Sequence, residues 1–110
     1  MKGTYIGEFE ELIMLAVASQ GDQAYAVSIK ESIENNAERS VAISAVHSAL
    51  YRLEQKGFLR SKLGGATQKR GGKEKRLFQI TNSGLAALRE SKELREGYWN
   101  KIPHLSLRKL

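Results

Sequence analysis

The sequence predicts a mainly helical α+β fold: a winged helix-turn-helix with a two-stranded basic wing and a C-terminal dimerisation helix. A helical pattern of apolar residues runs from Ile43 to Gly57. Two short segments of alternating apolar and polar residues follow, Phe58–Leu63 and 75–81. A loop rich in glycine and lysine joins these two segments. Helix, strand, basic hairpin loop and strand, in this order, are typical of a winged helix.

The size and composition of the chain favour one globular domain. We expect residues 1–81 to form the winged helix-turn-helix and residues 82–110 to form the dimerisation helix and a short tail. The chain of 110 residues has no cysteine, so neither a disulfide nor a thiolate zinc site is expected. The longest apolar run, Leu12–Ala18, is too short to cross a bilayer, and the N-terminus lacks a signal peptide. These features predict a cytoplasmic protein without a membrane partner.

The distribution of charge indicates a polyanion as the partner. The net charge is +6, and the segment Arg60–Arg76 alone holds seven basic residues and one acidic residue. The rest of the chain is electrically balanced. Clustering of the entire excess on one element favours a phosphate-binding wing over a lysine-rich loop that only increases solubility. The predicted contacts of the wing and its flanks are Arg60, Lys62, Lys69, Arg70, Lys73, Lys75 and Arg76.

The first predicted helix spans residues 7–18. Apolar residues recur at helical spacing, and Glu8, Glu10 and Glu11 lie in the first turn. Acidic side chains there interact favourably with the positive end of the helix dipole. We prefer this interpretation to an acidic metal site, because no histidine or further carboxylate joins them in the motif.

The second predicted helix spans residues 24–36. Asp22 is its expected N-cap, and Tyr25, Ile29 and Ile33 form one apolar stripe at intervals of four residues. A short connection with some strand character then leads to Val41.

The third predicted helix is the candidate recognition helix. Ile43, Val46, Leu50 and Leu53 recur at intervals of three and four residues and are expected to face the core. The opposite face is polar and could enter a major groove, where serine and histidine can meet base edges and arginine can reach guanine or phosphate. The alternative is an ordinary solvent-exposed face. The predicted DNA-binding residues on this face are Ser44, His47, Ser48, Tyr51 and Arg52.

The hairpin after this helix has clear boundaries. Gly57 is the expected left-handed cap. In the first strand we expect Leu59 or Phe58, together with Leu63, to point inward, and the basic side chains to point away. The sequence 71–73, Gly-Gly-Lys, is not a nucleotide-binding P-loop, because neither the first glycine nor the following serine or threonine is present.

The last predicted helix begins at Thr81, its expected N-cap, and ends at Pro103. Large apolar side chains near its end need burial, which a partner surface would provide. Either they pack a dimer interface, or the aromatic pair also stacks on a flat aromatic ligand. The residues of this predicted dimer interface or ligand site are Leu94, Tyr98, Trp99 and Ile102.

No catalytic site is predicted, so we do not expect an enzyme. The two histidines, His47 and His104, have no carboxylate or thiol placed to form a dyad. Neither a cofactor nor a metal site is expected, because the ligands for a metal are too few.

Several motifs resemble the PadR family of bacterial transcriptional regulators. They cover roughly residues 6–90 and comprise segments 7–12 (GEFEEL), 21–25 (GDQAY), 50–57 (LYRLEQKG), 70–72 (RGG) and 75–84 (KRLFQITNSG). The resemblance implies a repressor that binds promoter DNA as a homodimer through its C-terminal helix. In many members a small effector, often aromatic, releases the DNA. The chain departs from the family pattern at His47, where tyrosine is usual, at Ala42 and at Ala26.

The predicted function is therefore a sequence-specific DNA-binding transcriptional regulator, expected to be a homodimeric repressor of PadR type on a pseudo-palindromic operator. Its expected partners are double-stranded DNA, a second copy of the chain and a small aromatic effector. The alternative is a winged-helix protein-interaction module that binds another protein through its C-terminal helix and tail.

Overall fold

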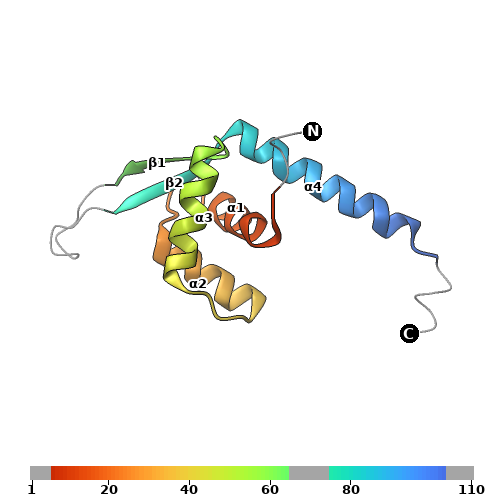
Figure 1. Ribbon diagram of the computed structural model, residues 1–110, viewed down its shortest axis with the longest axis horizontal. Coiled ribbons are helices and arrows are strands. Elements are labelled where there is room, and N and C mark those ends of the chain that lie inside the picture. The colour runs from red at the N-terminus through yellow and green to blue at the C-terminus, as the bar shows by residue number, and fades with distance from the viewer. Residues whose placement is uncertain (1–5, 65–74, 104–110) are drawn as a thin grey trace.

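The computed structural model describes residues 6–64 and 75–103, which fold into four helices and one two-stranded antiparallel sheet (Figure 1). This is the predicted helix, strand and hairpin order. The elements are α1 (Glu8–Ser19), α2 (Ala26–Ala37), α3 (Ile43–Gln55), β1 (Leu59–Leu63), β2 (Arg76–Ile80) and α4 (Asn82–Lys101).

The core lies between the first three helices and the base of the hairpin. Helix α1 contacts α2, α3, β2 and the first part of α4, so it lies at the centre of the molecule (Figure 1). Burial of large aliphatic side chains from five of the six elements provides the main driving force for this packing. The largest fully buried side chains are Ile13, Met14, Val17, Ile29, Val46, Leu50, Leu53 and Leu59.

Helix α2 begins two residues later than predicted, and Asp22 is not its cap. Tyr25 is the N-cap, and its backbone N–H donates to the Ser28 hydroxyl at 2.9 Å. The preceding residue, Ala24, is held in an extended bridge to the sheet, where its carbonyl accepts from the Phe78 N–H at 2.8 Å. Because of this tertiary hydrogen bond, Ala24 stays extended and the helix begins only after Tyr25. The apolar stripe had predicted that Tyr25 lies inside the helix.

Helix α3 confirms the prediction except at its first residue. Val46, Leu50 and Leu53 are buried, but Ile43 is 38% exposed. Ile43 opens the helix beyond the edge of the core, and Ala49 completes the buried face instead.

Gly57 confirms its predicted role as the cap of α3. It has a φ of 81°, and the N–H of Phe58 donates to the Leu53 carbonyl at 2.9 Å, while the N–H of Gly57 donates to Glu54 at 3.0 Å. These two bonds form a Schellman motif, which satisfies the last carbonyls of the helix. The motif turns the chain directly into β1.

The hairpin pairs Leu59 with Ile80 and Leu63 with Arg76. Only its base joins the core: Leu59 and Phe78 are buried, whereas Leu63 is 56% exposed. The prediction that Leu63 points into the core is therefore wrong, because β1 extends beyond the helices that could cover this side chain.

Helix α4 begins at the predicted cap and then leaves the body of the molecule (Figure 1). The Thr81 hydroxyl oxygen accepts from the Gly84 N–H at 3.0 Å, and the hydroxyl donates to the Gly57 carbonyl at 2.7 Å. Pro103 follows the end of the helix, as predicted. The first turn is thus tied to the end of α3, while the distal half is exposed.

Within the described ranges, none of the helices is both long enough and apolar enough to span a bilayer.

The two glycines of α4 provide a matched test of this packing. A Cβ at Gly84 would lie 2.2 Å from the Phe58 carbonyl oxygen, whereas one at Gly97 would meet nothing within 4 Å. We expect Gly84→Ala to lower the free energy of unfolding by about 1–3 kcal/mol, because backbone must shift. Gly97→Ala should raise it by about 1 kcal/mol through helix propensity. Urea unfolding measures both, and equal effects of the two variants would contradict the close approach of α4 to the Phe58 backbone.

Candidate nucleic-acid interface

The outer face of α3 is open to solvent along its whole length. All five predicted DNA-binding residues on this helix are exposed, and Tyr51 is exposed by 66%. His47 and Tyr51 follow each other at a spacing of four residues and so share one face. The face presents hydroxyl, imidazole and phenol groups, which can form hydrogen bonds with base edges.

The described part of the wing carries basic side chains on both faces. Arg60 and Lys62 alternate with the buried Leu59 and are exposed, as predicted. Their register partners on β2 are Gln79 and Leu77. The Arg60 Nε donates to the Gln79 side chain at 3.2 Å, which aligns the guanidinium along the sheet.

Arg76 lies on the other face of the hairpin, the face that includes Phe78. Its Nη1 donates to the Ser61 hydroxyl at 2.9 Å, and the side chain remains exposed. The predicted contacts Lys69, Arg70 and Lys73 lie outside the described residues.

Lys75 is directed towards an aromatic ring at the base of the wing. Its Nζ lies 3.6 Å from the centre of the Tyr25 ring, a close cation–π contact. The contact connects the start of β2 to the start of α2. Spacing alone gave no sign of this pair, since 50 residues separate its members.

Arg52 is also engaged within the chain. Its Nε donates to Oε2 of Glu10 at 2.9 Å, and Lys56 Nζ donates to Oε1 of the same carboxylate at 3.2 Å. From the sequence, Arg52 is predicted to contact DNA and Glu10 to interact with the helix dipole. The structure brings them together across a sequence separation of 42 residues.

The environment of Glu10 changes its acidity. Burial by itself would raise the pKa of this carboxyl group, but hydrogen bonds from Arg52, Lys56 and the Gly7 N–H outweigh it, so the pKa lies below the usual value of 4.5. The carboxylate is therefore ionised at neutral pH.

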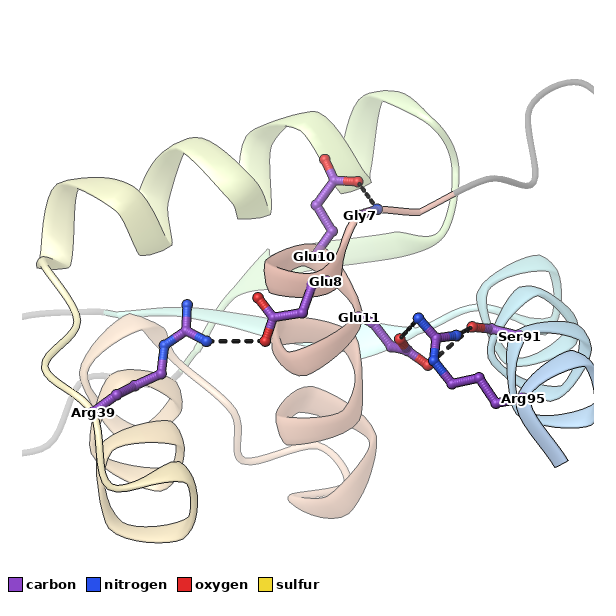
Figure 2. A network of polar contacts seen from close by, with 7 residues as sticks. All are labelled: Gly7, Glu8, Glu10, Glu11, Arg39, Ser91 and Arg95. Atoms are coloured by element: carbon purple, nitrogen blue, oxygen red, sulfur yellow. Dashed lines mark hydrogen bonds and ion pairs between the residues drawn. The ribbon is translucent and has the colours of Figure 1, made fainter. Parts of the chain in front are cut away.

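The other two acids of the first turn bind two further elements (Figure 2). Glu8 accepts from Arg39 Nη1 at 2.9 Å, in the connection between α2 and α3. Glu11 accepts from the Ser91 hydroxyl at 3.0 Å and pairs with Arg95 at 3.4 Å, both on α4. The three acids thus point in three directions from one turn, besides their favourable position at the helix N-terminus.

The predicted dimer or ligand residues form an exposed apolar surface on the distal half of α4. The exposed fractions are 61% for Leu94, 66% for Tyr98, 64% for Trp99 and 37% for Ile102. Leu94 and Tyr98 are four residues apart and share a face. So large an apolar surface on one helix is typical of an interaction site.

The described residues contain no group of three or more histidine, cysteine, aspartate or glutamate side chains that could hold a metal ion.

Comparisons with known proteins identify solved structures that share this fold. No family model matches the sequence, and no curated protein matches it significantly. Solved structures do match: a PadR-like transcription factor from Bacteroides fragilis has a TM-score of 0.73 at 23% identity, over 88% of each chain. A PadR-family transcriptional regulator from Eggerthella lenta has a TM-score of 0.64 at 26% identity, over 81% of this chain and 75% of its own.

The chain has the winged-helix fold of these PadR-like proteins. A third neighbour, a PadR-like transcriptional regulator from Bacillus cereus, agrees at a TM-score of 0.69 and 16% identity, over 84% of each chain. All three neighbours are named as transcription factors or regulators, and none as an enzyme. In this fold, the polar face of α3 and the basic side chains of the described hairpin are open to solvent.

The low pKa of Glu10 predicts acid sensitivity. A carboxyl group whose pKa is lower in the folded state stabilises the protein at neutral pH, and this stability is lost as pH falls through the folded pKa. We expect the free energy of unfolding of Glu10→Gln to depend less on pH than that of the wild type below pH 4.5. Urea unfolding between pH 7 and pH 3 measures the difference. Glu90→Gln, at an exposed position of α4, should keep the wild-type pH dependence; parallel curves for Glu10→Gln and wild type would contradict the prediction.

Proposed function

We propose that the protein is a sequence-specific DNA-binding transcriptional regulator. The observation that carries the proposal is the exposed polar face of α3 beside a hairpin segment that holds the entire net charge of the chain. A polar helix face provides hydrogen bonds to bases, and a basic hairpin provides affinity for phosphates. The names of the structural neighbours support the same class of function.

In this proposal α3 enters the major groove, and Ser44, His47, Ser48 and Tyr51 lie closest to base edges. The wing contacts the phosphate backbone next to the groove. Arg60, Lys62 and Arg76 are exposed along the described strands and can neutralise phosphates. Residues 1–81 then act as the DNA-binding unit.

We further propose a homodimer that forms through residues 82–110 and acts as a repressor. The exposed Leu94, Tyr98 and Trp99 support this, because pairing two α4 helices would bury them. A two-fold dimer would place two α3 helices in successive major grooves about 34 Å apart. The corresponding operator is a pseudo-palindrome.

A small aromatic effector is the proposed signal. Tyr98 and Trp99 could stack on a flat ring at the dimer interface and change the separation of the two α3 helices. A saturable change of Trp99 fluorescence with aromatic compounds would detect it.

The exposure of the same side chains also fits a second candidate function, a winged-helix interaction module that binds a different protein through the C-terminal segment. This function requires no basic wing, so binding to DNA discriminates between the two.

The wing predicts a salt-dependent contribution to DNA binding. We expect Lys69→Ala/Arg70→Ala/Lys73→Ala to weaken binding to all duplexes, since phosphate contacts carry little sequence information. The slope of log K against log salt should become shallower by about 0.9 for each lost contact. Fluorescence anisotropy across a salt series, on an upstream promoter duplex and on random duplex, measures both quantities.

His47→Ala serves as the contrast. It removes a side chain of the α3 face and should reduce the preference for the promoter duplex while leaving the salt slope unchanged. An unchanged affinity and slope of the wing variant would contradict the wing assignment. Failure of the folded wild type to bind DNA at low salt would favour the interaction module.

The distal half of α4 predicts the oligomeric state. We expect sedimentation to give a dimer mass for the wild type and a monomer mass for Leu94→Glu/Tyr98→Glu, because carboxylates would be buried against apolar surface. Glu93→Lys, at an exposed neighbouring position, controls for a change of charge. A monomeric wild type with Trp99 open to a soluble quencher would oppose the homodimer.

A further inference from the structure

Glu10 is the one buried charged residue among those the structure describes. Its side chain is 11% exposed, whereas those of Arg52 and Lys56 are 52% and 38% exposed. The acid belongs to α1, Arg52 lies in the last turn of α3, and Lys56 is the C-cap residue that follows this helix. A buried carboxylate thus faces two cations at the C-terminal end of the proposed DNA-binding helix.

The hydrogen bonds of Glu10 determine which residue of these ion pairs can move. The Glu10 carboxylate accepts from Arg52 at 2.9 Å, from Lys56 at 3.2 Å and from the Gly7 N–H at 3.4 Å. The carboxylate is anchored in its own helix and cannot follow a cation to the surface. If Arg52 or Lys56 swung out to a DNA phosphate, a buried anion would lose a charge-assisted hydrogen bond, which is costly.

We propose that Glu10 is a positioning residue of the proposed DNA-binding surface that limits its sequence-independent affinity for DNA. It holds Arg52 and Lys56 in ion pairs within the chain, keeps these two cations from DNA phosphates and fixes the C-terminal end of α3 against α1. The inference rests on the proposed function and revises the predicted DNA contact of Arg52.

The consequence for binding follows from what phosphate contacts do. Phosphate contacts raise affinity for all sequences equally. Withholding two cations from the backbone lowers non-specific binding and leaves discrimination to the exposed face of α3 around His47. The wing then supplies the sequence-independent attraction.

The test compares wild type with Glu10→Gln, which keeps the shape of the side chain and removes its charge. On random-sequence duplex we expect severalfold tighter binding and a salt slope steeper by about 0.9 for each released cation. Affinity for the promoter duplex should rise by a similar factor, so that the ratio of promoter to random affinity stays nearly unchanged, because phosphate contacts carry little sequence information. Glu90→Gln makes the same change of charge on exposed α4 and should leave the slope unchanged.

Two further variants separate released cations from altered folding. Adding Arg52→Gln and Lys56→Gln to Glu10→Gln should abolish the gain in affinity for random-sequence duplex. Arg52→Gln alone, at an exposed side chain, should leave the random-duplex affinity of the wild type nearly unchanged. If Arg52→Gln lowered the affinity for random duplex as much as Lys62→Gln does, the inference would be overturned, because Arg52 would then be a phosphate contact.

A readout without DNA gives an independent check. The Arg52 Nε–H should exchange slowly with solvent in wild type, as seen by ¹⁵N NMR, and rapidly in Glu10→Gln. Rapid exchange in wild type, or equal binding of wild type and Glu10→Gln to random duplex, would overturn the inference while leaving the proposed function intact. Failure of the wild type itself to bind DNA would overturn both, and this outcome is recognised because it needs no variant.

Discussion

The ion pairs of the buried Glu10 carboxylate are the interaction on which the arrangement of the proposed DNA-binding surface depends. A charge in this position is tolerated only because two cations and a backbone N–H satisfy it. Those cations come from α3, so the requirement to satisfy the charge fixes α3 on α1. Hydrophobic contacts between the same helices stabilise the packing but do not set its direction as closely, since apolar attraction is not directional.

The neighbouring acids extend this arrangement to the rest of the chain. Glu8 holds the connection before α3 through Arg39, whose guanidinium also lies 5.5 Å from the centre of the Phe9 ring. Glu11 binds Ser91 and Arg95 of α4. Figure 2 shows the contacts of Glu8 and Glu11. Together with the ion pairs of Glu10, they connect a single turn of α1 to the element proposed to read DNA and to the element proposed to form the dimer.

The basic side chains consequently fall into two groups. Arg60, Lys62 and Arg76 are exposed on the hairpin, where hydrogen bonds to neutral partners align the two arginines without neutralising them. Arg52 and Lys56 share the Glu10 carboxylate, which offsets one of their two positive charges. Composition gives the same weight to all of these side chains, but only the first group keeps its full charge for a polyanion. The net charge of a surface thus depends on tertiary pairing as well as on sequence.

Much of this protein was determined by local sequence. Several features could be predicted because each depends on residues that are close together in sequence. They are the helical periodicity of α1 and α3, the caps at Gly57 and Thr81, the end of α4 before Pro103, and the basic hairpin. The exposure of Ser44, His47, Ser48 and Tyr51 followed from the same periodicity. Only the tertiary structure decided the start of α2, the exposure of Ile43 and Leu63, and the partners of Lys75 and Arg52. The exposure of the two apolar side chains depends on where the core ends. The other features depend on contacts between residues that are distant in sequence, which no local pattern records.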